Sequence, residues 1–150
     1  MTIYLAADHA GFALKDKLKA QLIKQGHKIV DLTPVFKDGD DYPLVAKKLT
    51  KRLTSNSPLS RGKKGDLGVL SCGSGIGVCS AANRAKGIRA AVGHSPQEVK
   101  LAREHDDINV LCLSGWNNKS GTNAMKMINV FLKTKRSTVT RHVRRVKQLG

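Results

Sequence analysis

The most informative stretch of this chain is LGVLSCGSGIGVCSAAN, residues 67–83. Residues 67–70 form a short apolar run typical of a buried strand, and residues 77–83 can begin a helix. The glycines between them tolerate a positive φ and let a ligand approach the backbone. Backbone amides in such a turn, backed by a helix N-terminus, stabilise an oxyanion or a phosphate beside the Cys72 thiol. The stretch therefore predicts an active-site turn after a strand; a buried structural cysteine beside a tight turn is the alternative.

Outward from this stretch, apolar runs alternate with segments of helical period along the chain. Leu14, Leu18 and Leu22 place one apolar stripe on a helix that Gly26 can end. A capping box at 95–98, with proline at the first helical position, begins another helix. The expected strands are 3–7, 28–32, 67–70, 88–93 and 108–114, the further helices are 41–53, 77–83, 95–104, 122–132 and 139–149, and a basic loop covers 58–65. This alternation predicts an α/β fold with a parallel sheet and helices on both of its faces.

Length and composition indicate one folded domain spanning residues 1–150. A chain of 150 residues with 40% hydrophobic residues has enough material for one core. No apolar run approaches the ~18 residues of a membrane span, and the N-terminus lacks the basic opening of a secretory signal. The three cysteines are an odd number and have no zinc-site spacing, which predicts reduced thiols, no bound metal and a cytoplasmic location.

The charge balance is strongly basic, with 27 Lys and Arg against 11 Asp and Glu and a formal net charge of +16. The excess is concentrated at 47–64 and 133–147. Such segments attract anions, whether a nucleic acid, an acidic membrane or a phosphorylated metabolite, and a solvated surface without a partner is the alternative. The aromatic content of 4% argues against a base-stacking platform, so nucleic acid is not the expected partner.

Polar side chains gather near the ends of the expected strands, where parallel α/β sheets bind ligands. Asp8 and His9 follow the first strand, Cys72 follows the third, and residues 105–107 (HDD) precede the fifth. We expect these groups to meet at one edge of the sheet as an acid/base set for moving protons on a small anionic substrate. The chain has neither the glycine pattern of a dinucleotide fold nor that of a nucleotide P-loop.

Six motifs together resemble the ribose-5-phosphate isomerase B family, which includes the galactose-6-phosphate isomerase subunits. In order they are ADHAG at 7–11, DYP at 41–43, CGSGIG at 72–77 with AAN at 81–83, GIRA at 87–90, REHDDINV at 103–110 and RHVRR at 141–145. The resemblance implies a Rossmann-like three-layer α/β/α sandwich with a five-stranded parallel sheet and a C-terminal helix. It also implies a homodimer, or a tetramer, without metal or cofactor, in which the partner subunit contributes the histidine-bearing segment to each site.

The resemblance also assigns roles to residues in the isomerisation of a phosphorylated sugar. Cys72 would be the base that moves a proton between C1 and C2 through a cis-enediolate; another family branch uses a glutamate, where this chain has Val78. Asp8 and His105 would open the sugar ring, with His105 as the proton donor. The remaining substrate-binding positions are His9, Arg141 and Arg145 for the phosphate, Gly73, Ser74, Gly75, Ile76 and Gly77 for the oxyanion, and Tyr42 and Asp106.

Ribose 5-phosphate and ribulose 5-phosphate are the expected substrate pair. A six-carbon sugar phosphate, from allose or galactose, is the alternative, and a noncatalytic protein that binds nucleic acid or a phosphometabolite is a rival from another class. Two positions depart from the family pattern, because Asp106 replaces a usual asparagine and Trp116 aligns with an arginine.

Overall fold

A computed structural model describes residues 1–56 and 65–149. Its elements are β1 (Thr2–Ala7), α1 (Phe12–Lys24), β2 (Lys28–Asp31), α2 (Tyr42–Asn56), β3 (Leu67–Cys72), α3 (Ile76–Ala82), β4 (Ala90–Val92), α4 (Pro96–His105), β5 (Val110–Ser114), α5 (Thr122–Lys133) and α6 (Thr140–Gln148). Most of the basic loop expected at 58–65 lies outside the described residues. Within them, no helix is both long and apolar enough to cross a membrane.

The described strands form one parallel sheet in the order β2-β1-β3-β5-β4. β1 pairs with β2 on one side and with β3 on the other. The chain leaves β1 toward α1 on one face of the sheet and leaves β3 toward α3 on the opposite face. The carboxyl ends of β1 and β3 therefore form the switch point at which doubly wound sheets bind ligands.

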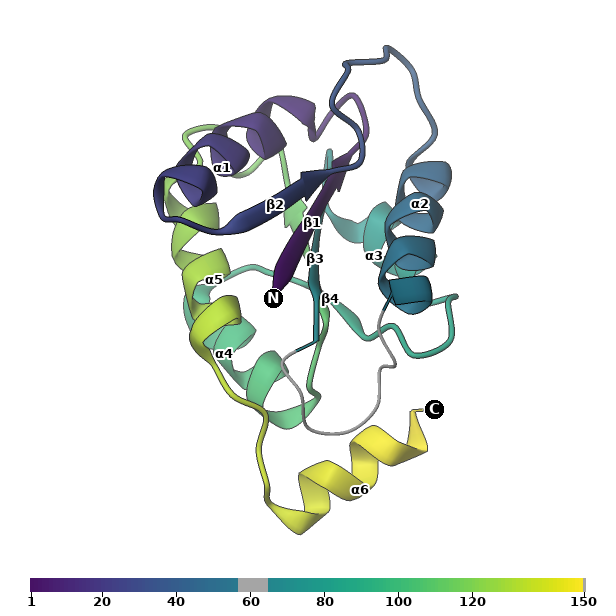
Figure 1. The fold of residues 1–150 in the computed structure, drawn as a ribbon, viewed down its shortest axis with the longest axis vertical. Coiled ribbons are helices and arrows are strands. Elements are labelled where there is room, and N and C mark those ends of the chain that lie inside the picture. The colour runs from purple at the N-terminus through teal and green to yellow at the C-terminus, as the bar shows by residue number, and fades with distance from the viewer. Residues whose placement is uncertain (57–64, 150) are drawn as a thin grey trace.

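Alternate residues of the strands pack into two apolar layers, one on each face of the sheet. Ile3 and Leu5 belong to one layer, and Tyr4 and Ala6 belong to the other. Helices α1, α4 and α5 cover the first layer, whereas α2 and α3 cover the second (Figure 1). The central strands β1, β3 and β5 are buried on both faces, as expected of a parallel sheet, whereas the edge strands β2 and β4 are only partly buried. The predicted α/β/α arrangement is confirmed.

The observed elements follow the expected ones with small shifts at their ends. Ser95 caps α4 by accepting a hydrogen bond from the Glu98 amide at 3.2 Å, as predicted. Gly26 follows α1 with a φ of +80°. The fourth strand is shorter than expected because the Arg89 amide donates to the Asn109 side chain at 2.8 Å and takes no part in the sheet.

The C-terminal helix α6 lies beyond the amino ends of the strands, at the lower end of the view in Figure 1. The segment before it is tied to α4, because the Ser137 amide donates to the Glu104 carbonyl at 2.8 Å. The His142 ring on α6 lies 4.2 Å from the His105 ring at the end of α4, measured between ring centroids. These contacts place the basic helix at the edge of the sheet opposite the switch point.

Candidate active site

Cys72 is the last residue of β3 and is buried in the layer under α2 and α3. The turn behind it needs a glycine at Gly75, whose φ of +82° is left-handed. This geometry lets the Gly75 amide donate to the Cys72 sulfur at 3.2 Å, a contact that a thiolate accepts more strongly than a thiol. The thiol is thus held at the start of the glycine turn.

The amides of the turn are divided between internal contacts and open positions. The Gly75 amide binds the Cys72 sulfur, and the Ile76 amide donates to the Ser74 hydroxyl at 3.2 Å. Within the described residues, no acceptor is recorded for the amides of Gly73, Ser74 and Gly77. These three amides and the Ser74 O–H are therefore the donors available to an oxyanion. The Ile76 side chain, at the start of α3, is exposed beside them.

Asp8 lies in the loop after β1, which packs directly on the end of β3. A Cβ atom at Gly11 would lie 2.7 Å from the Cys72 amide nitrogen, so only glycine permits this approach. The Gly11 amide donates to the Asp8 carboxylate at 2.9 Å. Burial raises the pKa of Asp8, and the opposing hydrogen bond from Gly11 and the charge of His9 do not cancel this effect.

His9 is held by an aspartate that the sequence did not single out. The Asp40 carboxylate accepts the His9 amide at 2.7 Å and lies 3.2 Å from the Nδ1 atom of the same residue. The hydrogen bond to Asp40 raises the pKa of the His9 imidazole, which favours the cation that a phosphate would bind. Asp40 stands just before the DYP motif, and this acidic neighbour was the available signal.

Tyr42 begins α2, and its ring lies on the far end of the glycine turn. A Cβ atom at Gly77 would lie 3.0 Å from Cε2 of that ring. The Tyr42 side chain is nevertheless partly exposed, with 44% of the residue accessible. The structure thus gathers Asp8, His9, Tyr42, Cys72 and residues 73–77, which we call the carboxyl-edge half-site.

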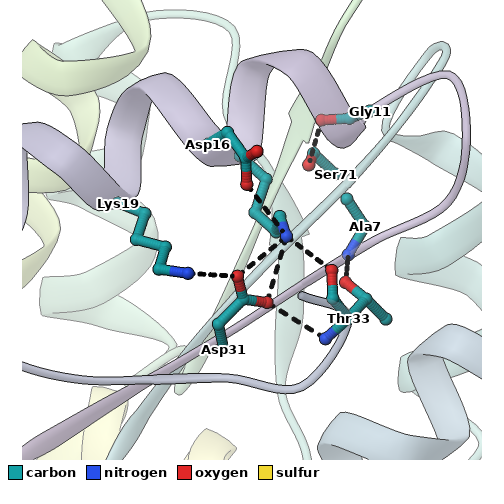
Figure 2. Close-up of polar contacts among 8 residues, drawn as sticks. Ala7, Gly11, Asp16, Lys19, Asp31, Thr33 and Ser71 are labelled. Atoms are coloured by element: carbon teal, nitrogen blue, oxygen red, sulfur yellow. Dashed lines mark hydrogen bonds and ion pairs between the residues drawn. The ribbon is translucent and has the colours of Figure 1, made fainter. Parts of the chain in front are cut away.

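An ion-pair network centred on Lys15 and Asp31 lies next to the end of β1 (Figure 2). Lys15 donates to both oxygens of Asp31, at 3.1 and 2.9 Å, and to the Thr33 carbonyl at 2.6 Å. The Thr33 hydroxyl accepts the Ala7 amide at 2.9 Å, immediately before Asp8 in the chain. The network therefore fixes the end of β1 to α1 and to the end of β2.

We expected His105 to join Asp8, His9 and Cys72 at one edge of the sheet, and this expectation was wrong. A residue that precedes a parallel strand lies at its amino end, whereas residues that follow strands lie at the carboxyl end. β5 pairs with β3 so that Cys72 lies opposite Ser114, at the far end of β5 from His105. The strand separates the two ends by about 13 Å.

His105 instead meets the C-terminal helix at the amino edge. Burial lowers the pKa of His142, and the charges of His105, Arg141 and Arg145 lower it further. Its Nε2 atom accepts from the Arg141 side chain at 3.2 Å, and its buried Nδ1 atom has no partner in the described chain. We call His105, Asp106, Arg141, His142 and Arg145 the amino-edge half-site. His142 was missed as a site residue, although it lies inside the RHVRR motif.

The loop that carries His105 is clamped from two sides. Asp107 has a φ of +49°, which is unusual for a residue with a side chain. Arg89 and Arg103 both pair with its carboxylate, and the Arg89 side chain also donates to the Asp106 carbonyl at 3.1 Å. These contacts hold Asp106, which caps α4, and fix the position of the neighbouring His105.

The fold and the half-sites define a doubly wound α/β protein with a thiol, a carboxylate and an imidazole around a glycine turn at its switch point. Proteins of this class bind small anionic ligands there. The chain belongs to the ribose/galactose isomerase family, whose model matches residues 3–149.

Named relatives cover nearly the whole chain. A probable ribose-5-phosphate isomerase B from Mycoplasma genitalium is 39% identical over 148 residues, covering 98% of this chain and 92% of the relative. Ribose-5-phosphate isomerase B from Mycobacterium tuberculosis is 33% identical over 147 residues, covering 97% of this chain and 86% of the relative. The resemblance seen in the motifs is confirmed.

Solved structures of the same kind of protein share the fold. Ribose-5-phosphate isomerase B from Thermotoga maritima superposes with a TM-score of 0.88 at 36% identity, covering 99% of this chain and 96% of that one. The Mycoplasma genitalium enzyme with bound ribulose 5-phosphate gives a TM-score of 0.82 at 39% identity, covering 99% of this chain and 93% of that one. The predicted Rossmann-like sandwich is thereby confirmed.

Proposed function

We propose that this chain catalyses the reversible aldose–ketose isomerisation of ribose 5-phosphate and ribulose 5-phosphate. The family match over residues 3–149 carries the proposal. It is supported by relatives named ribose-5-phosphate isomerase B and by a structural neighbour that holds ribulose 5-phosphate. Oxidation at C2 is balanced by reduction at C1, so the reaction requires no redox cofactor.

In the proposed mechanism, Cys72 removes the proton from C2 and returns it to C1 through a cis-enediolate. Its sulfur is held by the Gly75 amide at 3.2 Å, so the base has a fixed position. Negative charge develops on the substrate oxygen during this transfer. The amides of Gly73, Ser74 and Gly77, with the Ser74 hydroxyl, are the donors that would stabilise it.

Ring opening precedes proton transfer, because the sugar enters as a closed ring. Asp8 would accept the hydroxyl proton at C1, and His105 would donate a proton to the ring oxygen. The raised pKa of Asp8, caused by its burial, makes this carboxylate a better proton acceptor than an exposed aspartate. Asp8 and Cys72 belong to one half-site, whereas His105 belongs to the other.

We therefore propose a homodimer, or a tetramer of such dimers, in which the amino-edge half-site of one chain faces the carboxyl-edge half-site of the next. The length of β5 (Val110–Ser114) supports this arrangement, because it keeps His105 away from Cys72 within one chain. Such an arrangement would bring Arg141 and Arg145 of one subunit toward His9 of the other. Three cationic side chains would then surround the substrate phosphate.

A subunit-mixing experiment tests the shared site. Cys72→Ala and His105→Asn chains should each be inactive alone, because each lacks one half of every site. After random exchange in equal amounts, heterodimers with one intact site should restore about one quarter of wild-type activity. No recovery, despite exchange demonstrated by native mass spectrometry, would overturn the shared site.

The substrate is tested by following isomerisation with NMR. Ribose 5-phosphate should turn over faster than allose 6-phosphate or galactose 6-phosphate, and preference for a six-carbon sugar would overturn the assignment. The basic residues within 133–147 are exposed, and this observation favours the rival function of a noncatalytic anion-binding protein. That rival predicts no turnover and a salt-dependent retention of RNA or DNA. We also propose that residues 1–150 form a single isomerase domain and that the protein is located in the cytoplasm.

A further inference from the structure

Trp116 is the single tryptophan of the chain, and it lies just after β5 against the glycine turn. A Cβ atom at Gly73 would lie 2.5 Å from Cε2 of the indole ring, so the ring occupies the space above that glycine. The residue is 64% exposed. A large aromatic side chain is therefore presented to solvent directly beside the residue that follows Cys72.

The backbone of Trp116 is fixed to the turn by hydrogen bonds. Its amide donates to the Gly73 carbonyl at 3.1 Å, and the Ser114 hydroxyl donates to the same carbonyl at 2.8 Å. The Gly115 amide donates to the Cys72 carbonyl at 2.9 Å. These bonds tie the start of the Trp116 loop to Cys72 and Gly73, so the backbone of Trp116 has a defined position relative to the thiol.

Two aromatic rings thus flank the glycine turn, with Trp116 at Gly73 and Tyr42 at Gly77. Aromatic residues make up only 4% of the chain, so their meeting at one turn is not explained by composition. Ligand pockets commonly combine aromatic walls with a few convergent polar groups. The turn supplies those polar groups between the two rings.

We infer that Trp116 contacts the substrate and forms a wall against which the carbon chain of the sugar phosphate packs. This inference rests on the proposed function, and it extends it by naming a residue that holds the sugar. The indole face carries partial negative charge and attracts the partly positive C–H groups of a sugar. Its single N–H donor and lack of charge make it unsuited to binding the phosphate dianion.

Because Trp116 is the single tryptophan, its fluorescence reports on this position alone. In a Cys72→Ala chain, which binds without turnover, titration with ribose 5-phosphate should shift the emission in a saturable way. Inorganic phosphate should leave the emission unchanged, because it has no carbon chain to pack on the ring. Calorimetry in parallel measures binding independently of the indole.

The two measurements separate failure of this inference from failure of the proposed function. Binding by calorimetry without any emission change would overturn the contact with Trp116 and leave the isomerase assignment standing. An equal response to inorganic phosphate would also overturn it, because the ring would then report the phosphate. Absence of binding by calorimetry would overturn the proposed function and this inference with it.

Kinetics of ring variants give a second readout. Trp116→Ala should raise KM for ribose 5-phosphate by about tenfold with little change in kcat, because it removes packing area and no reacting group. Trp116→Phe should restore most of the affinity, and Ile23→Ala serves as a control at an exposed apolar residue on α1. An unchanged KM in Trp116→Ala, or a loss confined to kcat, would overturn the packing role.

Discussion

Replacing Lys15 with methionine should cost the protein a large part of its stability. Methionine retains an unbranched apolar stem but lacks the ammonium group. Lys15 is 2% exposed and lies 2.9 Å from the nearer oxygen of Asp31, which is itself 5% exposed. Its Nζ atom also donates to the Thr33 carbonyl at 2.6 Å. The variant therefore leaves a buried carboxylate and a carbonyl without their main donor (Figure 2).

The size of the stability loss depends on the hydrogen-bond donors that remain around Asp31. Removing one partner of a buried ion pair costs ~3–5 kcal/mol, because the other charge stays buried. Lys19 still lies 2.9 Å from the Asp31 carboxylate, and the Thr33 amide donates to it at 3.0 Å. We therefore expect a loss near the lower end, about 3 kcal/mol, which corresponds to a fall in Tm of roughly 6–12 °C.

The stability loss of Lys15→Met should become smaller at low pH. Burial raises the pKa of Asp31, but hydrogen bonds from Lys15 and Lys19 outweigh it and hold the pKa below the ordinary value of 3.8. A depressed carboxyl pKa stabilises the fold above the unfolded-state pKa, and this contribution is lost as pH falls through the folded-state pKa. The difference between wild type and Lys15→Met should therefore narrow as the pH drops below about 4.

Urea denaturation at pH 7 and at pH 3.5 measures both quantities. Lys19→Met is the matched control, since its side chain is 35% exposed and contacts the same carboxylate. The control should cost less than about 1 kcal/mol. A Lys15→Met chain as stable as this control, or a stability difference that does not change with pH, would contradict the stabilising role of the buried Lys15–Asp31 pair.

Three further predictions concern the site. Cys72→Ala should abolish exchange of the substrate C2 proton with solvent deuterium, measured by NMR, whereas Cys79→Ala should leave this exchange normal. Exchange that persists in Cys72→Ala would remove the thiol from the mechanism. Arg141→Ala should weaken phosphosugar binding roughly ten- to hundredfold, seen as a raised KM, whereas Arg144→Ala should leave the KM unchanged. Similar small changes in both variants would contradict binding of the phosphate by Arg141. Gly11→Ala should lower the free energy of unfolding, measured by urea denaturation, by at least ~1–3 kcal/mol and should lower kcat, because its Cβ would clash with rigid backbone. A variant with unchanged stability and kcat would argue against that close packing.

Much of the fold was predictable because local patterns and the tertiary structure agree. The strands are continuous apolar runs, and the cap at Ser95 acts within three residues of sequence, so both leave a local signature. β4 was predicted too long, because Arg89 bonds to the side chain of Asn109, which lies distant in the sequence. No local pattern records such a contact.

The site was only half predictable. Residues that follow strands, such as Asp8 and Cys72, were correctly gathered, because strand direction alone places them. His105 was misplaced because it precedes its strand, and chain polarity sends it to the opposite edge. Lys15 drew no notice, since a lysine in a helix is ordinarily exposed and its partner Asp31 lies in the next element, at the end of β2.

The contact of Gly11 with the main chain at Cys72 has a consequence for how this site can change. Two peptide backbones touch there with no side chain between them, so the spacing of Asp8 and Cys72 is set by covalent geometry and strand pairing. Substitutions elsewhere cannot lengthen or shorten that spacing by small steps. We therefore expect differences in sugar specificity to arise from residues in the outer walls of the site. The distance between the Asp8 carboxylate and the Cys72 thiol should stay the same.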